Sequence, residues 1–215
     1  MTRKGLLIWM LMVLTTAALL TGCGDTNVEE VNRGETGSTA KQPQMPNDDI
    51  HAGLGAATSA VAGITWSIPD QWTNGPARQM RVATYLIGEG VNEADCAVFY
   101  FGPNQGGSVE ANIDRWIGQF NQPDGSSSRD KALINNRDVN GLSVTTIELS
   151  GTYTASMGGP MSGNKEERPG WRMMGAIVEA PEGPVFFKVT GPEETVVEAA
   201  DEFEQLVNSV KAVGA

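Results

Sequence analysis

The chain begins with two basic residues, Arg3 and Lys4, which are followed by an uncharged apolar segment at residues 6–20. These 15 residues are fewer than the roughly 20 that a membrane-spanning helix requires. Basic residues, a short apolar stretch and then small residues form the layered order of a secretory signal. We therefore expect a signal peptide at residues 1–22, so that only the chain after it is available to fold.

The signal ends in Leu20-Thr21-Gly22-Cys23, which resembles the lipobox of bacterial lipoproteins. The resemblance implies diacylglycerol on the Cys23 thiol, cleavage by signal peptidase II before Cys23 and three acyl chains in all. Each buried methylene contributes about 0.8 kcal/mol, so this lipid would hold the protein firmly. We predict lipid attachment at Cys23, and a place in the cell envelope at the outer membrane or on the outer side of the cytoplasmic membrane.

The segment at residues 23–61 is rich in Gly, Ala, Asn, Asp, Glu, Thr and Pro, and its large apolar residues follow no period. A composition of this kind cannot bury a core and indicates a disordered tether. Residues 62–214 are one domain's worth of chain, long enough to bury a core. We therefore predict a lipid-anchored tether followed by one folded domain.

Charge and reactive side chains exclude several classes of function. The net charge of −11 argues against a nucleic-acid partner, because phosphate backbones require clustered Lys and Arg. The one histidine, His51, lies in the tether, away from any base position that Ser-His or Cys-His catalysis needs. Cys96 lacks a disulfide partner once Cys23 is acylated, so we predict that it is buried. No catalytic set, metal site or cofactor is expected.

Strand patterns dominate the predicted domain. Alternating or continuous apolar runs predict strands at residues 63–68, 79–87, 95–101, 132–139, 142–152, 172–179 and 185–190. We expect the third of these strands to be buried on both faces. Turn sequences at Asn140-Gly141 and Glu182-Gly183-Pro184 predict two short hairpins, and therefore antiparallel pairing.

Two amphipathic helices complete the pattern. The first follows Ser108, a suitable N-cap, and its apolar stripe is Val109, Ile113, Trp116, Ile117 and Phe120. The second begins at Pro192 with two acidic residues, and its stripe is Val196, Ala200, Phe203, Val207 and Val210. Strands, a helix, more strands and a terminal helix predict an α+β fold with a mostly antiparallel sheet packed by helices.

Three blocks of the sequence resemble an uncharacterised family of bacterial exported proteins and lipoproteins. The blocks are Trp66 with Pro69 and Trp72, residues 115–120 (Arg-Trp-Ile-Gly-Gln-Phe), and residues 186–192 (Phe-Phe-Lys-Val-Thr-Gly-Pro). The order of elements is also similar to the PsbP and Mog1 fold, an antiparallel sheet between helices. The resemblance implies a fold and no reaction.

Two segments carry candidate partner contacts. Asn112, Arg115 and Gln119 share one polar face of the first helix; such faces are usually only solvated, but the planar fork of Arg115 suits carboxylates and carbonyls. The Gly-rich segment at residues 154–169, which contains Met157 and Met161, is long for a loop, and such loops are functional or disordered.

The leading hypothesis is a membrane-tethered, non-enzymatic binding or assembly module of the bacterial cell envelope, with an envelope protein as a possible partner. The alternative is a carboxylate- and arginine-based enzyme or small-ligand binder that uses Glu110, Asp114 and Arg115. Paired carboxylates can perform acid–base chemistry without histidine if burial separates their pKa values. A pocket at these three side chains would favour the alternative.

Overall fold

The computed structural model describes residues 58–156 and 165–214. The predicted signal peptide, Cys23 and most of the tether lie outside the described residues, as do Met157 and Met161. Within the described ranges, no helix has the length and apolar character needed to cross a bilayer.

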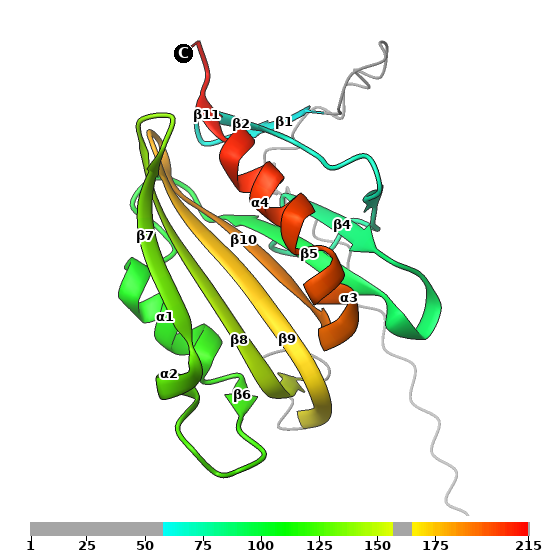
Figure 1. Cartoon of the computed structure of the whole chain (residues 1–215). Coiled ribbons are helices and arrows are strands. Elements are labelled where there is room, and N and C mark those ends of the chain that lie inside the picture. The colour runs from blue at the N-terminus through cyan, green and yellow to red at the C-terminus, as the bar shows by residue number, and fades with distance from the viewer. Residues whose placement is uncertain (1–57, 157–164, 215) are drawn as a thin grey trace, which may run out of the picture. The chain divides into compact units, whose positions relative to one another are not determined.

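An eight-stranded sheet forms the centre of the described fold, in the order β3-β4-β5-β10-β9-β8-β6, with β7 paired to β8 (Figure 1). All of its strand pairs are antiparallel. The strands are β3 (Thr73–Asn74), β4 (Ala83–Ile87), β5 (Ala94–Tyr100), β6 (Phe120–Asn121), β7 (Leu133–Val139), β8 (Leu142–Ser156), β9 (Lys165–Ala180) and β10 (Gly183–Pro192). A smaller sheet contains β1 (Thr58–Val61), β2 (Ile64–Ser67) and β11 (Lys211–Ala212).

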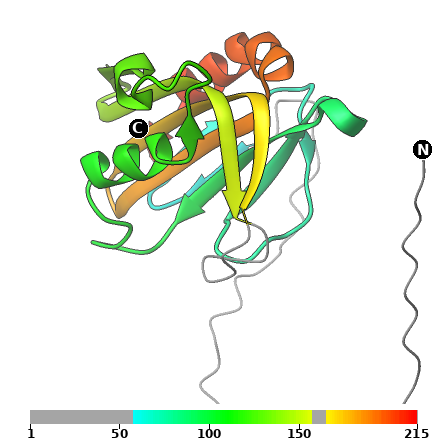
Figure 2. The same ribbon diagram turned by 90° about the horizontal axis from the view of Figure 1, so that it is seen from below.

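Helices lie on both faces of the large sheet (Figures 1 and 2). On one face, α3 (Glu193–Glu198) and α4 (Ala200–Ser209) pack together with the small sheet. On the opposite face lies α1 (Val109–Ile117), followed by the short α2 (Ser128–Lys131). A 3-10 turn, η1 (Gly90–Asn92), connects β4 to β5. The predicted α+β class with a mostly antiparallel sheet is confirmed.

Strand alternation divides the core into two layers. On β10, Val185, Phe187 and Val189 pack with the α4 layer, whereas Phe186 packs with the α1 layer. Successive side chains of a strand point to opposite faces, so Lys188 shares the face of Phe186. The basic side chain of Lys188 therefore points from β10 to the face of the sheet on which α1 lies.

Local signals placed the hairpins and the first helix correctly. The β7–β8 turn holds Asn140 at φ 50° and Gly141 at φ 81°, the left-handed conformation that Asn-Gly adopts readily. Ser108 caps α1, because its hydroxyl accepts a hydrogen bond of 3.2 Å from the Ala111 amide. Cys96 is fully buried, as predicted.

Two strand predictions need correction. The strand predicted at residues 79–87 begins only at Ala83, because Met80 has φ 67° and the Arg81 amide bonds the Arg78 carbonyl in a turn. The strand predicted at residues 95–101 is not buried on both faces. Its Cys96 side is core, whereas its Asp95 side is only partly covered, since α1 does not extend over it.

Three boundaries also differ from prediction. Much of the predicted loop at residues 154–169 is strand, because β8 and β9 remain paired from Thr154 opposite Glu167 to the ends of both strands. The ordered hairpin β1–β2 begins at Thr58, four residues inside the predicted tether. The terminal helix is divided at Ala199, whose ψ of 8° departs from helical geometry.

Gly175 on β9 lets α1 approach the sheet closely. A Cβ atom built on Gly175 would lie 2.4 Å from Cζ3 of Trp116 and 2.9 Å from Cε3. Trp116 is buried, and its ring meets Phe186 edge to face at a centroid distance of 6.5 Å. Because Gly175 has no side chain, the ring of Trp116, the largest residue of α1, can pack directly against β9.

Candidate functional site

A cleft of about 540 Å³ opens on the α1 face of the sheet. We call it the Lys188 cleft, and its lining includes Arg81, Asp95, Gln119, Tyr153, Trp171 and Lys188. Ligand sites of proteins commonly enclose about 300–1,000 Å³, so the cleft has room for a small molecule. The lining residues come from six separate parts of the chain.

The cleft exists because α1 covers only part of its sheet face. Ile113 and Trp116 pack against one portion of that face, which includes Met173, Ile177 and Phe186. Further along β5 and β10, the same face carries the neighbouring pairs Lys188 opposite Ala97 and Thr190 opposite Asp95. No helix among the described residues covers this second portion. Polar side chains there border a hollow instead of a packed layer.

Lys188 is the buried cation of the site, with 8% of its surface exposed. Its Nζ donates a hydrogen bond to Oε1 of Gln119 and lies 5.3 Å from the centre of the Tyr153 ring. Burial lowers the pKa of Lys188 to about 8, against an opposing effect of the Asp95 carboxylate. The ammonium is thus predominantly charged at neutral pH, with a neutral amide as its acceptor.

Gln119 reaches Lys188 because of the close packing at Gly175. In the strand register, Lys188 lies directly opposite Gly175, so Trp116 is seated beside Lys188. Gln119 follows Trp116 by about one helical turn. The backbone N–H of Gln119 donates to the backbone carbonyl of Trp116 at 3.1 Å. The end of α1 thereby carries the Gln119 side chain onto the ammonium.

Arg81 and Asp95 form the second charged element of the cleft. Arg81 Nη1 donates to Asp95 Oδ2 at 2.7 Å, and the two side chains are 18% and 23% exposed. The guanidinium carbon of Arg81 also lies 5.7 Å from the centre of the Phe99 ring. Partial burial and two contacts hold this pair in place more firmly than a surface ion pair.

An aromatic stack forms the opposite wall. The rings of Tyr153 and Trp171 are parallel within 6°, with centroids 5.5 Å apart, and the guanidinium of Arg168 lies 4.6 Å over Trp171. A β-bulge between Gly151 and Tyr153 shifts the register of β8 against β9 here. Bulges redirect side chains, and the side chain of Tyr153, directly after this bulge, lines the cleft. Burial raises the pKa of Tyr153, so the phenol stays neutral at neutral pH.

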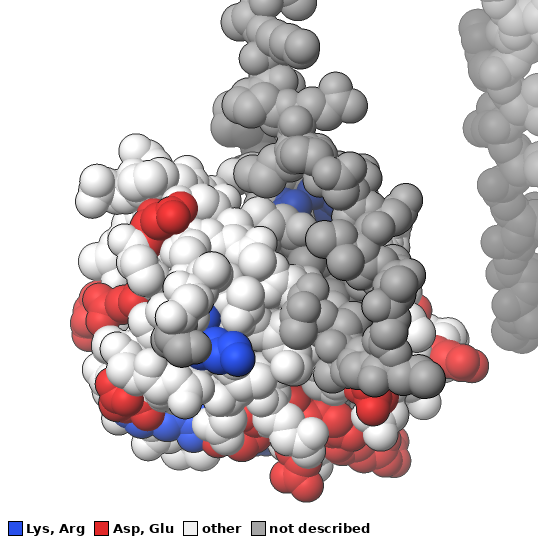
Figure 3. Space-filling model, turned by 90° about the horizontal axis from the view of Figure 1, so that it is seen from above, with Lys and Arg blue, Asp and Glu red and all other residues white. Residues whose placement is uncertain are grey.

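The charge of the cleft is opposite to that of the chain. Four basic side chains line it, Arg78, Arg81, Arg168 and Lys188, but only two acidic ones, Glu93 and Asp95. The whole chain has a net charge of −11. Acidic side chains form the larger charged patches on the end of the domain seen in Figure 3. A positive cleft on an acidic protein concentrates anions locally.

The predicted polar face of α1 is not a single surface. Asn112 is only 3% exposed, and its amide donates to the carbonyls of Gly106 and Ser108 at 2.8 and 2.9 Å. Arg115 is exposed and donates to Asn112 Oδ1 at 2.7 Å. Asn112 therefore anchors the loop before α1 and is not available to a partner. Gln119 belongs to the Lys188 cleft.

The alternative hypothesis, that Glu110, Asp114 and Arg115 line a pocket, is wrong. All three side chains are exposed, and none of them lines the Lys188 cleft. Asp114 is engaged by Arg129 of α2. The helical spacing of these residues places them toward solvent, because the apolar stripe takes the sheet-facing side of α1.

Sequence reasoning missed most of the cleft, including Lys188, Asp95, Tyr153 and Trp171. One signal was present for Lys188, which follows Val185-Phe186-Phe187 and precedes Val189. A lysine inside a central apolar strand is rarely buried without a reason. That interruption alone marks β10 as a place to search for a site.

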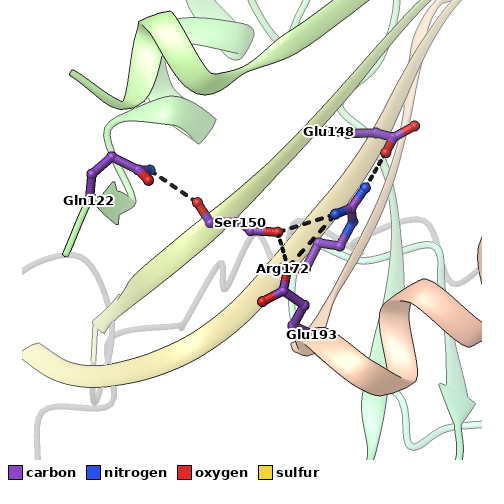
Figure 4. Close-up of polar contacts among 5 residues, drawn as sticks. All are labelled: Gln122, Glu148, Ser150, Arg172 and Glu193. Atoms are coloured by element: carbon purple, nitrogen blue, oxygen red, sulfur yellow. Dashed lines mark hydrogen bonds and ion pairs between the residues drawn. The ribbon is translucent and has the colours of Figure 1, made fainter. Parts of the chain in front are cut away.

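A separate polar cluster lies on the α3 face of the sheet (Figure 4). Arg172 of β9 contacts Glu148 and Ser150 of β8, and the Ser150 hydroxyl donates to Glu193 at 2.7 Å. Gln122 Nε2 donates to the Ser150 carbonyl at 3.0 Å. Since Glu193 is the first residue of α3, the cluster fastens the start of that helix to the sheet. Its role is structural.

Lys188→Met tests whether the buried charge of Lys188 lowers the stability of the domain. In the folded domain the pKa of Lys188 falls from 10.5 to about 8, so the fold opposes its protonation below pH 8. This opposition is relieved as the pH rises from 8 toward 10.5. We expect Lys188→Met to raise the free energy of unfolding by about 1–3 kcal/mol at pH 7, and less at pH 10. Urea unfolding of both proteins measures this.

Lys131→Met is the matched control, because the Lys131 side chain is 51% exposed. It should change the free energy of unfolding by less than about 0.5 kcal/mol. A Lys188→Met protein less stable than wild type at pH 7 would contradict the expectation.

Comparisons with known proteins give a partial match. No family model and no curated protein matches the sequence, so membership of the exported-protein family stays a prediction. Solved structures that match include cyanobacterial PsbP (CyanoP) from Synechocystis, with a TM-score of 0.48 and 8% identity over 78% of this chain and 98% of that one.

Two further structures match less well. LpqN of Mycobacterium tuberculosis, described as involved in cell envelope biogenesis, has a TM-score of 0.45 and 8% identity over 75% of this chain and 86% of its own. A Bacteroides thetaiotaomicron protein has a TM-score of 0.34 and 10% identity over 70% of this chain and 45% of its own. With every TM-score below 0.5, none of these proteins transfers a function to this chain.

Proposed function

We propose that the protein is a membrane-tethered, non-enzymatic binding module of the bacterial cell envelope, and that it takes a small polar ligand into the Lys188 cleft. Lipid on Cys23 would hold it at the membrane, and residues 24–57 would act as the tether. The anchor rests on the Leu-Thr-Gly-Cys sequence behind an apolar segment. An envelope protein that delivers or receives the ligand would be a natural partner.

One observation carries the binding role: a buried lysine, bonded to a neutral amide, lies in a cleft of about 540 Å³. Burial of a charge is unfavourable unless it is well compensated. An apolar residue at this buried position would avoid the cost of burying a charge. The retained ammonium therefore points to a ligand that interacts with it.

The test is photo-crosslinking in living cells from the rim of the cleft. A photoreactive amino acid replaces Arg78, which is exposed and lines the cleft, and in a matched protein it replaces Glu110, which is exposed on α1 outside the cleft. We expect mass spectrometry of the recovered protein to show an adduct at position 78 and none at position 110. Equal labelling at both positions, or turnover of a substrate that requires the cleft, would count against a binding module.

A further inference from the structure

The Lys188 ammonium has hydrogen-bonding capacity that the domain does not use. An ammonium offers three donors, and among residues 58–156 and 165–214 its one hydrogen bond is to Gln119. The centre of the Tyr153 ring lies 5.3 Å from Nζ, which is a cation–π contact and not a hydrogen bond. At least one donor therefore remains for a ligand within the cleft.

The other charged groups reinforce this preference. Arg81 enters from the segment before β4 and engages Asp95 with Nη1 alone, which leaves other guanidinium donors. Arg78 is exposed at the rim. Arg168 lies over Trp171 on the aromatic wall, where it pairs with Glu166 at 2.8 Å and therefore adds less to the potential. Because Arg81 already engages Asp95, that carboxylate does not neutralise Lys188 by direct contact. A cationic ligand would meet a positive surface.

The chemistry of the lining also limits the ligand. Thr190, Gln119 and the charged groups form much of the wall, whereas Ala94, Ala97 and Phe99 contribute limited apolar surface. An acyl chain would leave these polar groups without partners, which is unfavourable. A small polar solute with an anionic group matches the lining.

We propose that the Lys188 cleft binds an oxyanion, a carboxylate or phosphate group of a small polar molecule or a lipid headgroup, directly on the Lys188 ammonium. This inference rests on the proposed binding function and specifies its ligand. Charge-assisted hydrogen bonds from an ammonium to an oxyanion are stronger than neutral ones. Gln119 orients the ammonium, and Arg81 and Arg78 add favourable potential.

Binding should depend on pH through Lys188. The charged and titratable groups that line the cleft with Lys188 are Arg78, Arg81, Glu93 and Asp95 on the β4–β5 side, and Tyr153 and Arg168 on the aromatic wall. The acceptor of its hydrogen bond is Gln119, after α1. The pKa of Lys188 is about 8, whereas the pKa of Tyr153 is raised. Lys188 is therefore the cleft group that loses its charge first as the pH rises, and an anion would leave with it.

The experiment measures binding of inorganic phosphate to the full chain in non-ionic detergent by calorimetry, with chloride at equal ionic strength as the reference. We expect saturable binding at pH 7, and an affinity at least tenfold lower for Lys188→Met. Lys131→Met should bind like wild type. Between pH 8 and 9.5, where phosphate stays a dianion, the wild-type affinity should fall about tenfold.

Equal phosphate affinity in wild type and Lys188→Met, or an affinity that is constant up to pH 9.5, overturns the oxyanion site. A stable Lys188→Met fold, checked by urea unfolding, ensures that lost binding does not reflect unfolding. Displacement by micelles containing phosphatidic acid would assign the oxyanion to a lipid headgroup. Displacement by soluble glycerol 3-phosphate alone would assign it to a free solute.

The two proposals fail separately. If phosphate does not bind but crosslinks still form from position 78 alone, the binding module stands and the oxyanion is wrong. If neither phosphate binding nor a crosslink specific to position 78 is found, the proposed function fails as well.

Discussion

Gly175→Ala should destabilise the domain by about 3 kcal/mol, the upper end of the usual effect of adding a methyl group to a packed core. The new Cβ atom would lie 2.4 Å from the Trp116 ring, a distance that no relaxation of one side chain can absorb, because Trp116 is wedged against Phe186. Either α1 moves outward or β9 bends. For a domain of this size the melting temperature should fall by about 10 °C, as measured by circular dichroism.

A double-mutant cycle separates the clash from other effects. In a Trp116→Leu background the ring is absent, so Gly175→Ala should destabilise by less than about 1 kcal/mol. Equal losses of unfolding free energy in both backgrounds would show that the contact is not the cause. The variant should also weaken phosphate binding, since an outward shift of α1 withdraws Gln119 from Lys188.

Cys23→Ser should abolish acylation, because the thiol is the atom that receives the lipid in the lipobox reading. Without the thioether, the lipoprotein peptidase has no substrate. Uncleaved precursor should therefore accumulate, with its apolar segment as an imperfect anchor. Radiolabelled palmitate, followed by immunoprecipitation, measures both the label and the size of the product.

Cys96→Ala is the matched control for this experiment, since Cys96 is the other cysteine of the chain. It should take up palmitate as wild type does and mature to the same size. If wild type takes up no label, or Cys23→Ser is labelled and processed equally, the lipoprotein reading is wrong. The prediction is independent of the Lys188 cleft.

The predictable parts of the fold have local causes. Asn140-Gly141 fixes a hairpin through backbone conformations of its own residues, and Ser108 starts α1 through one hydrogen bond three residues away. The apolar stripe of α1 identified its buried side, including Ile113 and Trp116. Signals of this kind depend on residues that are close in the sequence, so they can be identified without knowing the tertiary structure.

The Lys188 cleft could not be predicted in this way. Arg81, Gln119 and Lys188 line one cleft although they come from distant parts of the chain. Gln119 reaches Lys188 only because α1 packs closely on β9 at Gly175. The role of Asn112 was missed for a related reason. Helical spacing alone placed it on a polar face, but the preceding loop folds back and buries it.

Cys96 gives the folded domain a chemically silent thiol. The side chain is 0% exposed in the α4 layer, and burial raises its pKa, so the nucleophilic thiolate that disulfide exchange requires is absent. An oxidant or a disulfide can react with this sulfur only while the chain is unfolded. Modification of Cys96 by an added thiol reagent would therefore record the opening of the core, so the rate of labelling would measure how often the folded domain unfolds.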